Sequence, residues 1–147
     1  MLSLAQNNGD DHPEAAGKHL ADAAALVKAR RWDGAAYLTD YVVECALKTF
    51  ILLNDSAWRH PPGKGHDLNL LTKEALRLAA LSTAKTAKYA LGISPGDSIC
   101  DQKNGWRETL RYHPQGTVSK VRATQWLGEA QKTYRNTVVL MRLDGVI

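Results

Sequence analysis

Residues 106–114 gather side chains that could act on phosphate. Trp106, Arg107, Arg111, Tyr112 and His113 lie within nine consecutive positions. A guanidinium group can bind two phosphate oxygens at once, and aromatic rings stack on bases. An imidazole can accept or donate a proton near neutral pH. The segment therefore indicates contact with a nucleotide or with RNA phosphate.

The same segment has a structural interpretation that stays open at this point. Trp106 and Tyr112 would fasten the segment to the body of the protein. Arg111 would then pair with a buried acid such as Glu44.

A second group of polar side chains lies in the long apolar stretch of residues 33–53. Glu44 and Lys48 are four positions apart in the order that favours an ion pair on a helix. At helical spacing they share a face with two tyrosines, Tyr37 and Tyr41. The pair is either a solvated stripe or part of a functional or interface face on a largely buried helix.

Several other kinds of site are not expected. The two cysteines are far apart, and His60 and His66 are separated by a Pro-Pro-Gly turn without acidic partners, so we predict no metal site. The chain has no glycine-rich phosphate loop of the P-loop or Rossmann pattern. No cofactor is predicted.

The length and charge of the chain limit the number of domains and the kinds of partner that we expect. The 147 residues suit a single domain over residues 1–147. Residues 1–100 carry 11 Lys+Arg and 11 Asp+Glu, so the net charge of +4 lies in residues 101–147. A basic last third fits a phosphate-bearing partner. No apolar run approaches the length of about 18 residues that is needed to cross a bilayer, and no signal peptide is evident. The small number of cysteines fits the reducing cytoplasm.

The elements that would position these residues are helices. One helix is expected to open at His12, and a central helix at Asp33 as its N-cap. A third would follow the cap Asp67 and continue as far as Tyr89, and the last would begin near Ser119. Residues 1–11 are expected to be flexible, and residues 92–118 to form a long loop before the last helix. The pattern predicts an all-α fold, a four-to-five-helix up-and-down bundle.

Parts of the chain resemble the HEPN (higher eukaryote and prokaryote nucleotide-binding) domains. The string AAYLTDYVVECALKTFI is similar to their second helix, and so is the step His66, Asp67 and Leu68 that follows it. Arg111 and Tyr112 ahead of the last helix add to the likeness, which covers nearly the whole chain. The resemblance implies an α-helical bundle that is often dimeric.

The resemblance also implies two kinds of function. One kind cleaves RNA without metal through an Arg and a His, and Arg107 and His113 fit its spacing. There His113 would exchange a proton with the ribose 2′-hydroxyl or the leaving 5′-oxygen, and Arg107 would steady the phosphate charge. The other kind binds nucleotides or partners, often beside a nucleotidyltransferase.

Our leading hypothesis is a cytoplasmic, homodimeric HEPN-like protein that binds nucleotide or RNA phosphate. It would work within a toxin–antitoxin or nucleotidyltransferase-associated system, without contact to a membrane. Its binding face would include Glu44, Lys48, Arg111 and Tyr112, beside Arg107 and His113. One alternative is a metal-independent endoribonuclease that uses Arg107 and His113 as catalytic residues. Another is a non-catalytic module that binds a second protein.

Overall fold

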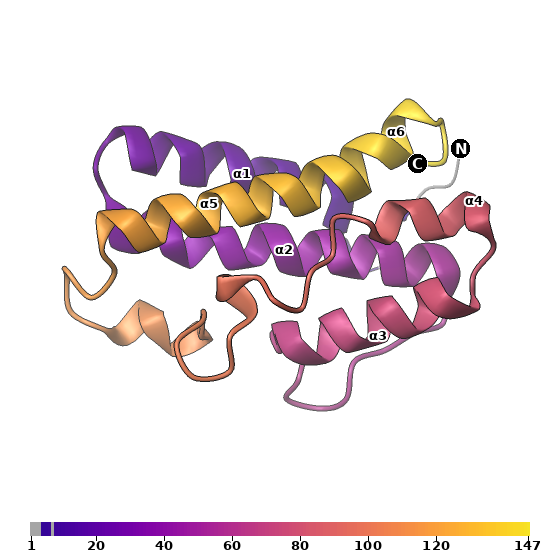
Figure 1. Ribbon diagram of the computed structural model, residues 1–147, viewed down its shortest axis with the longest axis horizontal. Coiled ribbons are helices and arrows are strands. Elements are labelled where there is room, and N and C mark those ends of the chain that lie inside the picture. The colour runs from indigo at the N-terminus through magenta and orange to yellow at the C-terminus, as the bar shows by residue number, and fades with distance from the viewer. Residues whose placement is uncertain (1–3, 7) are drawn as a thin grey trace.

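The computed structural model describes residues 4–6 and 8–147, and every regular element in this part of the chain is helical. Figure 1 shows the arrangement of the helices. They are α1 (His12–Lys28), α2 (Trp32–Asn54), α3 (Leu68–Leu81), α4 (Ala84–Ala87), α5 (Lys120–Tyr134) and α6 (Leu140–Leu143). A π-helical turn, Arg135–Val139, joins α5 to α6. The predicted all-helical class is confirmed. The predicted flexible terminus, residues 1–11, falls partly on residues 1–3 and 7, which lie outside the described residues.

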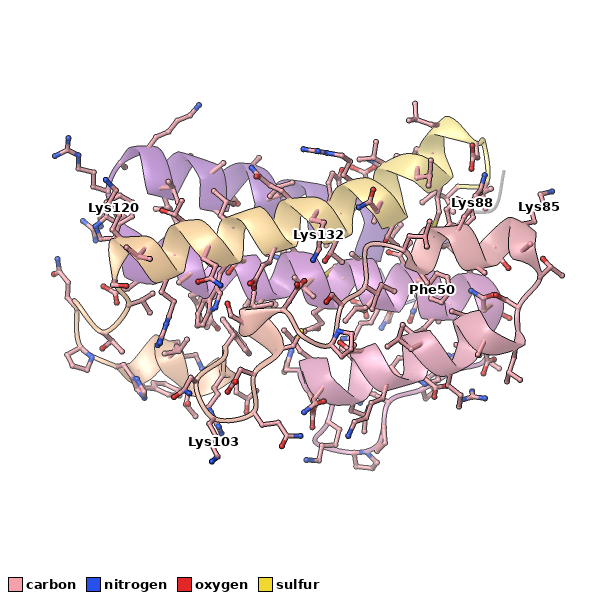
Figure 2. All side chains as sticks on the ribbon, viewed as in Figure 1. Phe50, Lys85, Lys88, Lys103, Lys120 and Lys132 are labelled. Atoms are coloured by element: carbon pink, nitrogen blue, oxygen red, sulfur yellow. The ribbon has the colours of Figure 1, made fainter. Side chains whose placement is uncertain are left out.

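Helix α2 is the centre of the bundle. From Thr39 to Leu52 every residue except Tyr41 is buried. Helices α1, α3 and α5 all pack against α2, as Figure 1 shows. Phe50, labelled in Figure 2, is one of its fully buried side chains. A helix that is apolar around most of its circumference is stable only when neighbours cover it on several sides, so α2 organises the rest of the fold.

Three helices begin at a side-chain cap. The carboxylates of Asp11 and Asp67 accept hydrogen bonds from the N–H groups of Glu14 and Leu70, three residues further on. The Ser119 hydroxyl accepts from the Arg122 N–H in the same way. Such caps satisfy N–H groups that have no partner inside the helix. The predicted starts at Asp67 and Ser119 are therefore confirmed.

The predicted cap of the central helix is wrong. The helix begins at Trp32, so Asp33 lies inside its first turn. The Asp33 carboxylate instead accepts hydrogen bonds from the backbone N–H groups of Gly116 and Val118, each at 2.8 Å. Partial burial alone would raise the pKa of Asp33, but these backbone hydrogen bonds outweigh it and lower the pKa. Asp33 thus ties the end of the long loop to α2.

The third helix is shorter than predicted. It stops at Leu81, where Ser82 and Thr83 adopt extended backbone angles before α4 begins. The Ser82 hydroxyl donates to the carbonyl of Ala79, which competes with continuation of the helix. The break lets the chain turn, so that the buried Tyr89 donates a hydrogen bond to Asp144 at the end of the protein.

Residues 92–118 form a loop that is attached to the bundle at several points. Inside it are two short 3-10 turns, Ser98–Cys100 and Glu108–Tyr112. The Glu129 carboxylate on α5 accepts hydrogen bonds from the N–H groups of Ser98 and Ile99 and from the Ser98 hydroxyl. Lys132, one turn further along α5, forms an ion pair with Asp97 at 2.7 Å. The loop is therefore positioned by α5 as well as by α2.

Replacing Glu129 by Ala is expected to lower the free energy of unfolding by about 2–3 kcal/mol, because it leaves the hydrogen-bond donors of Ser98 and Ile99 without their charged acceptor. Urea unfolding of the two proteins measures the difference. Gln131→Ala, at an exposed position of the same helix, is the matched control and should change stability by about 0.5 kcal/mol or less. Equal stability of Glu129→Ala and Gln131→Ala would show that Glu129 does not hold the loop.

Candidate functional site

The face of α2 predicted to carry Glu44 and Lys48 is covered rather than solvated. Glu44 is 4% exposed and Lys48 is 8% exposed. Their ion pair is short, at 2.6 Å, and the second Glu44 oxygen lies 2.8 Å from Nδ1 of His66. The interpretation of this pair as a solvated stripe is therefore wrong. Glu44 thus links the buried Lys48 to the half-exposed His66.

One turn before Glu44, Asp40 is completely buried, and neither of its carboxylate oxygens has a hydrogen-bond partner among the described residues. Burial raises the pKa of Asp40 well above its usual range, and the neighbouring charge of Glu44 raises it further, against the opposing effect of Lys48. The buried site therefore favours the protonated form of Asp40, whereas Glu44 has Lys48 and His66 as partners.

Trp106 covers the tyrosines on the same face of α2. Its indole N–H donates to the backbone carbonyl of Tyr37 at 3.0 Å, and its ring packs against Tyr37 and Tyr41 with centroids 5.7 Å apart in both cases. The two tyrosine hydroxyls lie 2.8 Å from each other. The structural role proposed for Trp106 is confirmed, because this side chain fixes the loop to the bundle.

The structural roles proposed for Arg111 and Tyr112 are wrong. Tyr112 is 75% exposed. Arg111 is exposed too, and its guanidinium lies over the Tyr112 ring at 4.9 Å, while Glu44 is paired with Lys48 and His66. Both side chains lie in the 3-10 turn Glu108–Tyr112, which follows Arg107. The Arg111 guanidinium also bonds to the Tyr37 side chain on α2, which raises the pKa of Arg111.

Two histidines of α1 flank the face from the other side. The ring of His19 lies 5.4 Å from that of Tyr41. Burial lowers the pKa of His12, with a further effect of Lys48, and burial with the charge of Lys18 lowers the pKa of His19. Both imidazoles are therefore expected to be neutral at pH 7, and they add no positive charge to the face.

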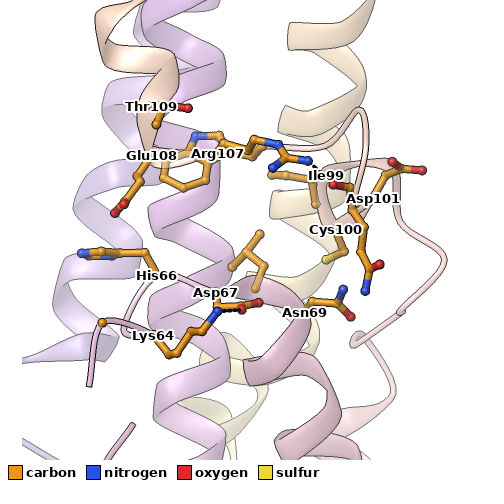
Figure 3. A pocket seen from close by; sticks show the side chains of 14 residues that line it. Lys64, His66, Asp67, Asn69, Ile99, Cys100, Asp101, Arg107, Glu108 and Thr109 are labelled. Carbon is orange, nitrogen blue, oxygen red and sulfur yellow. Dashed lines mark hydrogen bonds and ion pairs between the residues drawn. The ribbon is translucent and has the colours of Figure 1, made fainter. Parts of the chain in front are cut away.

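A cleft of about 540 Å³ opens beside this face, between the segment before α3 and the long loop. It is lined by Gly63, Lys64, His66, Asp67, Leu68, Asn69, Ile99, Cys100, Asp101, Gln102, Trp106, Arg107, Glu108 and Thr109. Figure 3 shows His66 and Glu108 on one side of the cleft, and the guanidinium of Arg107 on the side of Asp101. The cleft thus combines cations, carboxylates and an imidazole.

The acids of the cleft are partly occupied by structural contacts. Asp67 caps α3 and lies 3.5 Å from the Lys64 ammonium. The Asp101 carboxylate accepts hydrogen bonds from the N–H groups of Lys103 and Asn104. Arg107 donates to the backbone carbonyl of Gln102, which is a neutral acceptor. The Arg107 guanidinium therefore keeps most of its donors for a ligand.

Thiol chemistry is not favoured in this cleft. Burial raises the pKa of Cys100, which lines the cleft, to about 11, and burial raises that of Cys45 to about 12. The reactive form of cysteine is the thiolate. Neither side chain is therefore poised as a nucleophile at neutral pH.

Comparison of the chain with models of protein families, with curated proteins and with solved structures finds no match in any of the three. Within residues 4–6 and 8–147, no helix has the length and apolar character needed to cross a membrane. The same part of the chain holds no group of three or more His, Cys, Asp and Glu residues placed to bind a metal ion.

The structure divides the site residues proposed from the sequence into three groups. Arg107 lines the cleft, and Glu44 with Lys48 lies behind it, connected through His66. The exposed residues Arg111, Tyr112 and His113 are not among those that line the cleft.

Sequence reasoning gave His66 no chemical role, and it did not single out Lys64. His66 and Glu44 are 22 positions apart, so helical spacing could not connect them. The available signal was the position of His66 directly before the cap Asp67, in a segment that must return to α2 so that α3 can pack on it.

Proposed function

We propose that the cleft and the adjoining 3-10 turn bind nucleotide or RNA phosphate, in a HEPN-like domain. The observation that supports this most is the placement of Trp106 against α2. It brings Arg107 to the cleft that Lys64 and His66 also line, and Arg111 and Tyr112 follow in the exposed 3-10 turn. A bound strand could then pass from the cleft to the exposed turn.

The exposed turn has the parts of a stacking platform. Arg111 and Tyr112 form a cation and an aromatic ring in contact, and their exposure leaves the outer side of the ring accessible. Bases stack on such rings with little preference for sequence, and guanidinium groups bind the phosphates between them. The pair therefore suits a nucleotide or a single RNA strand.

The charged side chains of the cleft lie on both of its sides. Glu108 lies at the side of His66, and Asp101 lies at the side of the Arg107 guanidinium (Figure 3). Lys103 and Lys120, both labelled in Figure 2, add exposed cations at the end of the molecule that carries the long loop. We therefore expect a phosphate to bind across the cleft, between Arg107 and His66.

The binding test uses fluorescence anisotropy with a labelled single-stranded RNA at low salt. Arg107→Ala and Arg111→Ala are each expected to weaken binding by about 5- to 20-fold, and to reduce the slope of log K against log salt by about one phosphate contact. Lys85→Ala removes an exposed cation well away from Lys103 in Figure 2 and is the matched control. Absence of RNA binding, or equal affinities of all three variants, would overturn the proposal.

The HEPN resemblance extends the proposal to assembly. Two copies of the chain would bring two such clefts together, and a nucleotidyltransferase encoded with it as a toxin–antitoxin pair would be the partner. Size-exclusion chromatography with light scattering tests the homodimer at the concentrations used for binding. A monomer that binds RNA would remove the dimer from the proposal and leave the binding site.

The second candidate function is cleavage of RNA without a metal. The lining of the cleft favours it, because Arg107 and an imidazole border one cavity. The sequence suggested His113 as that imidazole. His113, however, is exposed and lies outside the set of lining residues.

A further inference from the structure

We propose that His66 is the proton-transfer residue of this cleft, oriented by Glu44, and that it acts on the ribose phosphodiester of single-stranded RNA. This inference rests on the proposed function, because it requires the RNA phosphate to bind in the cleft. It assigns proton transfer to His66 instead of His113, the histidine that the Arg and His spacing had suggested.

The hydrogen bond to Glu44 fixes which nitrogen of His66 is available. Nδ1 of His66 lies 2.8 Å from the Glu44 carboxylate, which forms the ion pair with Lys48. A carboxylate ion only accepts hydrogen bonds, so Nδ1 must carry a hydrogen. In the neutral imidazole, Nε2 then has the free electron pair that can accept a proton.

Glu44 is a rigid support for this imidazole. It is 4% exposed on the most buried helix of the protein, and Lys48 holds its other oxygen at 2.6 Å. The Tyr41 ring meets the His66 ring edge-on, with the centroids 5.8 Å apart. The orientation of His66 is therefore set from two directions, while half of its side chain (48%) remains exposed beside the cleft.

His113 has no comparable support. Its imidazole makes no hydrogen bond within the described residues, and it is exposed at the end of the 3-10 turn Glu108–Tyr112, before Pro114. A general base must be held within hydrogen-bonding reach of the proton that it removes. The arrangement of buried partners thus favours His66.

The reaction is an internal transfer of the phosphoryl group. Nε2 of His66 takes the proton of the ribose 2′-hydroxyl, and the 2′-oxygen forms a bond to phosphorus as the bond from phosphorus to the 5′-oxygen breaks. The 5′-oxygen takes a proton from water, and the resulting hydroxide accepts the proton held by His66. The products are a 2′,3′-cyclic phosphate and a 5′-hydroxyl, and no net water is consumed. Arg107 binds the phosphate as its charge develops.

The decisive experiment incubates the full chain with a single-stranded RNA in chelator and identifies the product ends. His66→Ala is expected to lower the cleavage rate by about 100-fold or more, because general acid–base groups typically contribute that much. The RNA affinity of this variant should stay within about twofold of wild type. Added imidazole should restore part of the lost rate, since the half-exposed position of His66 leaves room for it.

Two further variants separate chemistry from folding. Glu44→Gln is expected to lower kcat by about 10-fold with little change in KM, because Glu44 positions His66 without touching the RNA. His113→Ala should cleave within about threefold of wild type. Urea unfolding of each variant shows whether it is folded under the assay conditions, and imidazole rescue of His66→Ala itself requires a folded protein.

Each outcome decides one of the two proposals. RNA binding without cleavage by the wild type overturns the role of His66 and leaves the binding function standing. Absence of binding overturns the binding function on which the inference rests. Cleavage that persists in His66→Ala and disappears in His113→Ala would move the proton transfer to His113 and overturn the assignment.

Discussion

Replacing Trp106 by Ala is expected to lower the free energy of unfolding by about 3–5 kcal/mol and to detach the long loop from α2. Trp106 is 7% exposed, and its indole N–H donates to the carbonyl of Tyr37. Removing a large buried aromatic side chain loses its transfer free energy and leaves a cavity. The wall of the cleft is lost together with the packing, so RNA binding should weaken as well.

Urea unfolding gives the size of the effect, and two variants show its origin. Trp106→Phe keeps most of the ring packing and loses the N–H donor. Its free energy of unfolding should therefore fall by less, about 1 kcal/mol. Trp58→Ala removes a tryptophan that also packs against the core but does not line the cleft, and it should leave RNA affinity unchanged. A Trp106→Ala protein within about 1 kcal/mol of wild type would show that this side chain does not anchor the loop.

The helices could be predicted because their determinants are local. The apolar residues of α2 recur at helical spacing, and Asp67 and Ser119 occupy cap positions that the structure uses. Asp33 carries the same local signal as Asp67, yet it bonds to the backbone of Gly116 and Val118. Sequence spacing offers no means of distinguishing these two aspartates, since the competing partners of Asp33 lie more than 80 positions away.

The cleft could be predicted only in part for the same reason. Arg107 was recognisable from its chemistry and its neighbours. Its companion His66 became meaningful only when the segment before α3 folded back to place its Nδ1 against Glu44. The long loop was recognisable as irregular, but its attachment through Glu129 depends on a carboxylate one helix away. Periodicity reports which face of a helix is apolar and says nothing about which loop covers it.

Replacing Asp40 by Asn is expected to stabilise the protein, and the gain should grow as the pH rises. Asp40 is buried without a hydrogen-bond partner among the described residues, and burial together with the charge of Glu44 raises its pKa well above the usual range. The native state therefore holds this proton more tightly than the unfolded chain does. Raising the pH removes the proton from the unfolded chain first, which favours unfolding. The amide of the Asp40→Asn variant has no such proton to lose, so the variant escapes this effect.

The raised pKa of Asp40 determines the pH range in which the effect can be measured. The contribution of Asp40 to stability is complete below the carboxyl pKa of the unfolded chain, about 3.9, and is lost as the pH rises toward the native pKa, by up to about 1.4 kcal/mol per pH unit. Urea unfolding at pH 4.5, 6.0 and 7.5 should show the stability of Asp40→Asn rising relative to that of wild type at each step, with an upper limit of about 4 kcal/mol over the three pH units. Asp22→Asn, at an exposed position of α1, should stay within about 0.5 kcal/mol of wild type throughout. A constant difference between Asp40→Asn and wild type would mean that Asp40 is ionised in the folded protein. Glu44 would then share Lys48 with a second charge, and the support proposed for His66 would be weaker.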